Sequence, residues 1–186
     1  MGNTRADILH AARGILAQHS LAELTMRRLA AEVGVAPNAL YWHFADKQTM
    51  LAALADDLLA EVPARDDLPW TSALAAMAQD MRAALLAVPD SAEVVSSAWA
   101  SGLAGNDLAS RFAGIAASGG LLPSAAGGVA TALCQLTIGL SIEEQTRAQM
   151  ERLGVIGRSG RDYTAEFTAA LDVIVDGARA ASEAAR

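Results

Sequence analysis

Four side chains with hydrogen-bonding groups lie close enough along the chain to contact a nucleic acid together: Arg27, Asn38, Tyr41 and His43. They fall within residues 24–54, which read LTMRRLAAEVGVAPNALYWHFADKQTMLAAL. The hydrophobic spacing predicts an amphipathic helix at residues 25–32, a tight turn at Gly34, and a second short helix that starts at residue 37 and carries residues 40–44. This is the layout of a helix-turn-helix, whose second helix enters the major groove of DNA.

The packing of the two short helices must position these side chains. Gly34 suits the turn because glycine adopts a positive φ angle at little cost. Five apolar residues are spaced to pack the helices together: Leu29, Ala30, Val33, Val35 and Leu40. If these five lie inward, the four polar side chains remain free to face a nucleic acid.

The residues before each helix differ in how well they can cap it. Thr25 is a good N-cap for the first short helix, and the Asp46 carboxylate can cap the helix that follows the motif. Pro37 suits the first position of the second short helix. Ala36, just before it, offers no capping side chain, which weakens that helix by about 1 kcal/mol.

The run GVAPNALYWHFADKQTMLAAL resembles the tetracycline-repressor (TetR) family of one-component transcription regulators. That family has a helix-turn-helix followed by L-Y-x-H-F, a short polar break, a lysine and a long apolar helix. Tyr41 and Trp42 before His43 resemble the branch that contains the tetracycline repressor itself. A weaker similarity, LTIGLSIEEQ at residues 136–145, matches the long penultimate helix of that branch. The strong resemblance covers residues 5–62. From there to the C-terminus the resemblance is weak and lies mostly in the expected arrangement of helices.

The resemblance implies that four positions face the bases. Arg27 would reach a guanine edge, because its guanidinium matches the O6 and N7 acceptors. Asn38 can form two hydrogen bonds with adenine, whereas Pro37 and Ala39 offer only apolar contact, for example to a thymine methyl group.

The resemblance implies that four further positions contact the DNA backbone or a base edge next to it. Tyr41 would lie against a thymine methyl group or a phosphate, and Trp42 and His43 would donate to phosphates and fix the register. Lys47 is the only lysine and falls in the first turn of the next helix, where the family has a phosphate contact.

Other interpretations of the motif residues remain open. Arg27 and Arg28 are adjacent, so we expect one to face bases and the other to be a solvated charge. Trp42 could instead be partly structural, wedged between the third and fourth helices, and Phe44 is expected in the core. His10 and His19 do not have metal-ligand spacing and are expected to be structural or on the surface.

The resemblance also implies an effector cavity enclosed mainly by the fifth to eighth helices. The corresponding positions, with their plausible neighbours, are Met77, Met81, Val95, Trp99, Arg111, Phe112, Cys134, Ile138 and Glu143. Methionine and tryptophan make adaptable apolar walls, although such a stripe is also typical of a core. Trp70 is expected to be structural.

Tetracycline itself does not fit these positions. Val95 and Pro63 stand where the tetracycline repressors have pocket histidines, and Met77 replaces a polar amide. Glu143 alone is a poor magnesium site. It could instead recognise a cationic ligand or lie on the surface. We therefore expect a small, largely apolar effector and no metal or cofactor.

Composition favours an all-α fold with about nine helices. Apolar residues make up 53% of the 186 residues, and alanine dominates. The other expected helices span residues 4–18, 46–62, 70–87, 124–152 and 162–183, with two shorter ones within 91–118. We expect residues 1–45 to form a three-helix DNA-binding domain, joined by a linker helix to an effector-binding and dimerisation domain within residues 46–186.

Charge is distributed unevenly along this acidic chain. The net charge is −7, but residues 1–50 hold five cationic side chains against four carboxylates. The remainder therefore carries −8 and should repel DNA, which leaves the first part to make contact. An acidic surface that merely aids solubility would also explain this.

The sequence favours a cytoplasmic protein. We expect no membrane span, because no uncharged apolar stretch of 18 residues argues for one, and the N-terminus lacks an apolar signal core. The single cysteine, Cys134, excludes an internal disulfide.

Together these features predict a homodimeric repressor that an effector releases from a palindromic operator. The last two helices of each chain would pair across a twofold axis, because the long apolar helix needs more cover than one chain supplies. Effector binding would move the fourth helix and change the separation of the recognition helices. Whether the regulator represses or activates is left open.

Two other classes remain as alternatives. An architectural protein that binds DNA without sequence preference is compatible with the weak cap at Ala36. An enzyme is disfavoured, because the chain has no nucleotide-binding glycine loop, no G-x-S-x-G motif and no histidine beyond residue 43.

Overall fold

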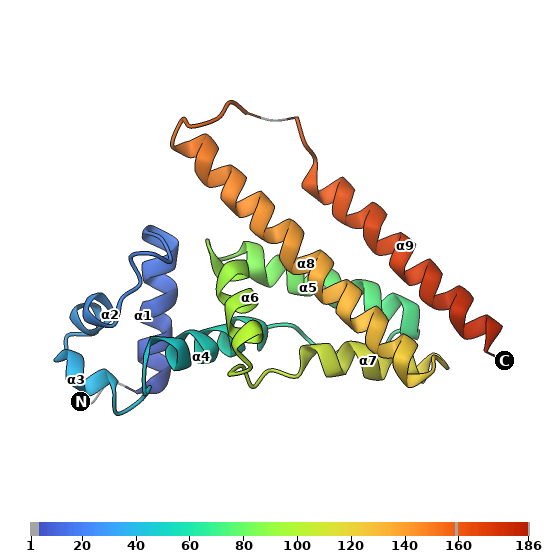
Figure 1. The fold of residues 1–186 in the computed structure, drawn as a ribbon, viewed down its shortest axis with the longest axis horizontal. Helices are drawn as coiled ribbons and strands as arrows, with labels where there is room; N and C mark the ends of the chain where they lie inside the picture. The colour runs from blue at the N-terminus through green and yellow to red at the C-terminus, as the bar shows by residue number, and fades with distance from the viewer. Residues whose placement is uncertain (1–3, 159, 186) are drawn as a thin grey trace. The chain divides into compact units, whose positions relative to one another are not determined.

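A computed structural model describes residues 4–158 and 160–185, and all regular secondary structure in that part is helical (Figure 1). The nine helices found there are α1 (Arg5–Gln18), α2 (Met26–Glu32), α3 (Pro37–Leu40), α4 (Lys47–Leu59), α5 (Trp70–Leu86), α6 (Ser91–Ser101), α7 (Leu108–Ser118), α8 (Pro123–Arg152) and α9 (Tyr163–Ala184). The predicted all-α class is therefore confirmed.

The helices group into two compact units. The first comprises Met1–Glu61 and Leu85–Asn106, and so contains α1 to α4 and α6. The second comprises Val62–Ala84 and Asp107–Arg186, with most of α5 and all of α7 to α9. The predicted division after residue 45 is a functional one and stays a prediction.

In the first unit, α1 packs against α2 and α4, α2 packs against α3, and α4 packs against α6. The apolar stripe of α1 is buried as predicted: Ile8, Ala12, Ile15 and Leu16. Opposite charges join α1 to α4, where Arg13 lies 2.7 Å from Asp57 and 2.5 Å from Glu61. These contacts fix α1 and α4 against each other, and α1 in turn packs against α2.

Local capping agrees with the sequence. The Thr25 hydroxyl accepts from the Arg28 backbone N–H at 3.1 Å, and the Asp46 carboxylate accepts from the Thr49 N–H at 2.7 Å. Ala36 provides no side-chain cap for α3, as predicted.

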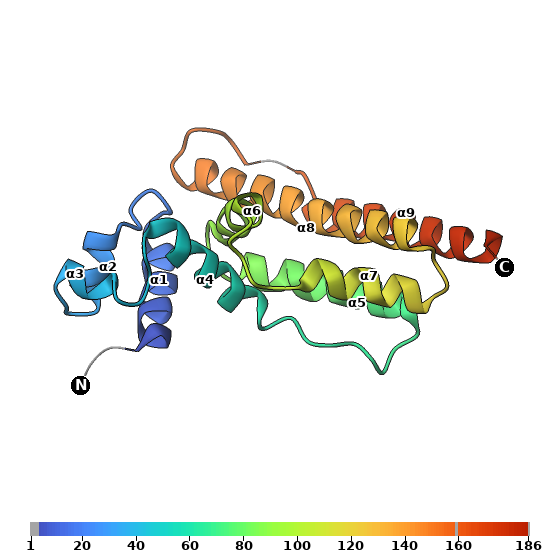
Figure 2. The same ribbon diagram turned by 60° about the horizontal axis from the view of Figure 1, so that its bottom comes forward.

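The second unit is built on α8, which packs against α7 and runs antiparallel beside α9 (Figure 2). The Trp70 indole lies so close to the end of α7 that a Cβ atom on Gly119 would come within 2.3 Å of it. The Ser182 hydroxyl of α9 donates to the Gly119 carbonyl at 2.5 Å. Trp70 therefore has the structural role that the sequence predicted.

The expectation about membrane spans needs correction for α8. By length and composition, this helix could cross a bilayer, with a window of mean hydropathy 1.5 of which 39% is buried. Residues 123–142 carry no charged side chain, which the sequence reading did not take into account. A core helix of a soluble protein passes the same test, so this one helix is weak evidence for a membrane.

Candidate nucleic-acid interface

The turn between α2 and α3 has the geometry of a helix-turn-helix. The chain leaves α2 through Gly34, whose φ angle is 72°. The Val35 N–H donates to the Ala30 carbonyl at 2.9 Å and closes the turn. α3 then starts at Pro37, which needs no backbone donor at that position.

The predicted inner residues lie inward. Leu29, Ala30 and Leu40 are fully buried, and Val33 and Val35 are half-buried. This leaves Arg27, Pro37, Asn38, Tyr41, Trp42 and His43 exposed, with Ala39 half-buried among them. The apolar spacing therefore predicted correctly which residues would face outward.

The recognition segment is shorter as a helix than predicted. α3 ends at Leu40, and Tyr41 to His43 form a turn in which the His43 and Phe44 N–H groups donate to the Leu40 carbonyl at 2.9 and 3.0 Å. A four-residue helix without a side-chain cap has little to extend it. The buried Phe44 ring then fixes the chain before α4. The prediction that one helix carries residues 40–44 is wrong.

Trp42 has no wedging role in this chain. Its side chain is 90% exposed, so the alternative that placed it between the third and fourth helices is wrong. At this exposure the indole N–H can donate to a partner outside the chain. Tyr41 beside it is 51% exposed.

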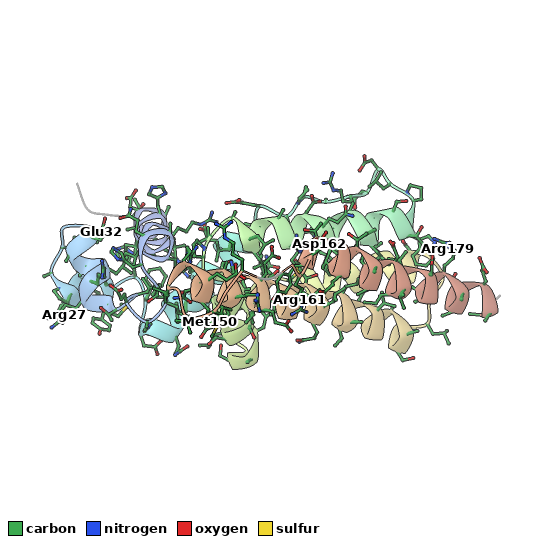
Figure 3. The ribbon with its side chains drawn as sticks, turned by 90° about the horizontal axis from the view of Figure 1, so that it is seen from above. Arg27, Glu32, Met150, Arg161, Asp162 and Arg179 are labelled. Carbon is green, nitrogen blue, oxygen red and sulfur yellow. The ribbon has the colours of Figure 1, made fainter. Side chains whose placement is uncertain are left out.

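The two adjacent arginines have different environments. Arg28 bonds to Glu23 and His19, so its charge is compensated within the unit. Arg27 projects outward (Figure 3), and it forms no ion pair with any residue in the described part of the chain. Arg27 is thus the arginine that can reach a base edge.

Lys47 stands at the start of α4, beside the exposed turn. Its side chain is half-buried and forms no ion pair within residues 4–158 and 160–185. The neighbouring Asp46 carboxylate caps the helix, and the Thr49 backbone N–H that donates to it holds the pKa of that carboxyl below its usual range. Asp46 is therefore engaged with the helix, and Lys47 keeps its donors for another partner.

Comparison with known proteins identifies the fold's relatives. A sequence model described as "Bacterial regulatory proteins, tetR family" matches residues 8–54. A second, described as "Tetracyclin repressor-like, C-terminal domain", matches residues 62–158, more than half of the chain. The chain belongs to the TetR family. This confirms the resemblance found in the motif, and the TetR family is one of regulatory proteins rather than of enzymes.

Individual TetR-family proteins match at different lengths. Tetracycline repressor protein class A from transposon 1721 of Escherichia coli is 42% identical over 92 residues. That match covers 47% of this chain and 42% of the repressor, so it spans less than half the length of this curated relative. The crystal structure of Mycobacterium smegmatis BioQ has a TM-score of 0.88 at 36% identity, covering 96% of this chain and 99% of that one.

A second BioQ structure contains DNA. This crystal structure of BioQ with its natural double-stranded operator has a TM-score of 0.77 at 33% identity, again covering 96% of this chain and 99% of that chain. A TetR-family fold like this one is therefore known in a DNA-bound form.

The predicted effector residues are divided between the two units. Val95 and Trp99 belong to α6 in the first unit, and the other seven lie in the second. Six of the nine are buried: Met77, Met81, Val95, Phe112, Cys134 and Ile138. The buried indole N–H of Trp99 has no hydrogen-bond partner in the described structure. That these residues form one pocket stays a prediction.

The second unit contains a cavity of about 300 Å³ that includes two of the predicted residues, Met77 and Arg111. The Arg111 guanidinium donates to the Val62 and Pro63 carbonyls at 3.2 and 2.8 Å, which holds it at the cavity wall. The remaining lining residues are Ala64, Arg65, Asp66, Gly114, Ile115 and Ser118. The sequence did not predict these six.

Glu143 lies on the surface of the second unit. Its carboxylate accepts from Arg161 at 2.6 Å, and Arg161 also bonds to Glu166. Among the described residues, no group of three His, Cys, Asp or Glu side chains could hold a metal ion. A contact between Glu143 and an effector stays a prediction.

The sequence reading missed Asp90, which connects α6 to the DNA-binding motif. Its backbone has φ 60°, and its carboxylate accepts from the Leu21 backbone N–H at 2.7 Å. Leu21 lies in the loop before α2. An aspartate directly before a helix is normally read as its N-cap, but Asp90 makes no capping bond to α6.

Proposed function

We propose that this protein is a transcriptional repressor that binds a palindromic operator as a homodimer and is released by a small, largely apolar effector. The observation that carries the proposal is the exposed polar set on a helix-turn-helix whose Leu29, Ala30 and Leu40 side chains are buried. The DNA-bound structure of BioQ supports it. The function involves no catalytic step and belongs in the cytoplasm, where the DNA is.

Each of the eight predicted DNA-facing residues has a proposed role at the DNA. Arg27 and Asn38 read base edges by hydrogen bonds, and Pro37 and Ala39 make apolar contacts in the major groove. The backbone contacts come from Tyr41, Trp42, His43 and Lys47, which fix the register without reading sequence. The side chains of Trp42 and Tyr41 are exposed, as expected of residues that DNA covers in the complex.

Two exposed glycine-containing faces support a homodimer. Gly128 and Gly139 on α8 and Gly177 on α9 are exposed, and a Cβ atom on any of them would meet nothing within 4 Å. Glycine inside a helix costs about 1 kcal/mol relative to alanine, and packing within this chain does not explain it. A helix of a second copy that approaches closely does. Val173 on α9, which is 73% exposed, would gain cover as well.

The effector is proposed to bind at the cavity of the second unit. Met77 offers an adaptable apolar wall there, and Arg111 is already held in place by two carbonyl groups. The effector binds one conformer of the protein more tightly than the conformer that binds DNA, and it therefore lowers the affinity for DNA.

Substitution of the DNA-facing residues tests the proposal. Tyr41→Ala and Lys47→Ala should each weaken operator binding by about tenfold or more in a gel-shift assay, because each removes a backbone contact on both subunits. Neither change should alter the thermal unfolding temperature by more than a few degrees, since both side chains are at least partly exposed. Unchanged affinity in both variants would remove these residues from the interface.

A further inference from the structure

The five cationic side chains of the first fifty residues fall into two groups. Arg13 is paired with Asp57 and Glu61, and Arg28 is paired with Glu23. The other three, Arg5, Arg27 and Lys47, form no ion pair within residues 4–158 and 160–185. Arg27 and Lys47 already have proposed DNA contacts, whereas nothing has given Arg5 a role.

Arg5 lies beside the recognition segment in space. Its guanidinium carbon is 4.7 Å from the centre of the Phe44 ring. Phe44 directly follows the exposed turn of Tyr41 to His43 and is itself only 1% exposed. The buried ring is therefore a fixed platform, and the exposed guanidinium rests on it.

This arrangement prepares Arg5 to bind an anion. The guanidinium carbon lies over the ring, and a phenyl ring has no lone-pair acceptor, so the five N–H donors of Arg5 remain available for another partner. The contact with the ring also restricts the side chain, so less conformational entropy is lost when the donors bind a partner.

The nearest acidic residue along the chain does not neutralise Arg5. The Asp7 carboxylate accepts from the Thr4 backbone N–H at 2.8 Å and from the Thr4 hydroxyl at 2.7 Å, which closes the capping box of α1. Arg5 is the first residue of that helix, where the aligned peptide dipoles add partial positive charge.

From these observations we propose that Arg5 binds a DNA backbone phosphate, as a third cationic contact of each subunit beside Arg27 and Lys47. The inference rests on the proposed function. A planar donor fork at a helix N-terminus suits a phosphate oxygen pair, and such a contact carries no sequence information. The chain has a net charge of −7, and its acidic part repels DNA. An uncompensated cation next to the recognition segment attracts the DNA backbone and so offsets part of this repulsion.

The salt dependence of binding tests this proposal. The full-length Arg5→Gln variant and the unchanged protein would be titrated against a duplex from the gene's own upstream region that the unchanged protein protects in a footprint. The logarithm of the binding constant falls with the logarithm of salt concentration by about 0.9 for each phosphate neutralised. Because a homodimer loses two contacts, the slope of Arg5→Gln should be smaller by about 1.8.

Two further variants serve as controls. Arg152→Gln removes an equal charge from an exposed position at the end of α8, and it should leave the slope unchanged. Arg5→Lys keeps the charge and should restore most of the slope. Thermal unfolding of each variant separates a loss of phosphate contact from a loss of packing on Phe44.

The outcomes are distinct. The proposal is supported if the slope for Arg5→Gln is reduced and the unfolding temperature is unchanged. The affinity should also fall by the same factor on operators that carry single base changes, because a phosphate contact does not read sequence. A slope equal to that of Arg152→Gln, or an affinity loss seen only with a lowered unfolding temperature, overturns it while the proposed function stands. If the unchanged protein protects no duplex, the proposed function itself fails, and the role of Arg5 fails with it.

Discussion

At the scale of single residues, identical side chains acquire different tasks from their neighbours. Arg27 and Arg28 are adjacent, yet only Arg28 finds a carboxylate, on Glu23. Adjacency alone predicted only that one of the two faces bases and the other does not, and the family resemblance assigned the base contact to Arg27. The choice depends on the loop before α2, where Glu23 and His19 are brought to the Arg28 side of the helix.

Cys134 illustrates how burial sets reactivity. The residue is 3% exposed on α8, and burial raises the pKa of its thiol to about 12. At pH 8 only about one thiol in 10⁴ would then be ionised, and the thiolate is the reactive form. We expect no labelling of the folded protein by a thiol reagent and complete labelling in urea. Rapid labelling of the native state would show that α8 is not packed as described.

The same shift predicts how stability depends on pH. The unfolded thiol titrates near its ordinary value of 9.0, whereas the folded thiol stays protonated to about pH 12. The folded state therefore holds its proton longer, and its stability is intact below pH 9.0 and declines as the pH rises between these values. Urea titrations of the unchanged protein and Cys134→Ala at pH 8 and 10 should differ in this decline, which is on the order of 1 kcal/mol per pH unit. Equal declines would contradict the assignment.

At the scale of elements, Asp90 adopts an unfavourable backbone conformation that its own helix does not explain. A left-handed backbone is unfavourable for a residue with a Cβ atom, and the helix behind Asp90 is left without a side-chain cap. In exchange, the carboxylate joins the start of α6 to the loop before α2. The other end of this segment is also held, because Asp56 on α4 accepts from the Gly105 and Asn106 N–H groups at 2.9 and 2.8 Å.

Substitutions at Asp90 should separate the backbone from the hydrogen bond. Asp90→Ala loses the bond to Leu21 and keeps the strained φ angle, so we expect it to lower the free energy of unfolding by about 2–3 kcal/mol. Asp90→Asn keeps an acceptor and tolerates the left-handed region, and it should cost less than about 1 kcal/mol. Urea unfolding measures both. Equal stability of the alanine and asparagine variants would show that the bond contributes little.

The helices were predictable from the sequence to within a few residues because proline, glycine and capping side chains mark their ends. Pro37 and Asp46 start helices where expected, and α8 begins at Pro123, one residue before its predicted start. The length of α3 was not predictable, since a four-residue helix and a turn use similar short-range hydrogen bonds. The Asp90 bond was not predictable either, because it joins residues 69 apart that only the tertiary fold brings together.

At the scale of the whole molecule, the proposed homodimer rests on the exposed faces of α8 and α9. The uncharged part of α8 is only partly covered within one subunit. In the proposed homodimer a second copy would supply the missing cover, and its helices would approach at the exposed glycines.

Enlarging one of these glycines should prevent assembly. Gly139→Leu places a bulky side chain on the exposed face of α8, where it has room within one chain. In the proposed dimer it would collide with the second copy. Sedimentation analysis should show monomers with retained helix content, and operator binding should fall by about a hundredfold or more because both recognition segments are no longer linked. Ala109→Leu, on the exposed surface of α7, is the matched control and should remain dimeric. A dimeric Gly139→Leu protein would place the interface elsewhere.

The central claim is that two copies of this chain bind one twofold-symmetric DNA site through residues 27–47. Footprinting on the gene's own upstream region, with the number of bound chains determined by sedimentation, tests it most directly. The account predicts one discrete palindromic footprint with half-sites about 34–36 Å apart, or a multiple of that distance, and an even number of chains bound in pairs. Diffuse protection that disappears with moderate salt, or one bound chain per site, would contradict it.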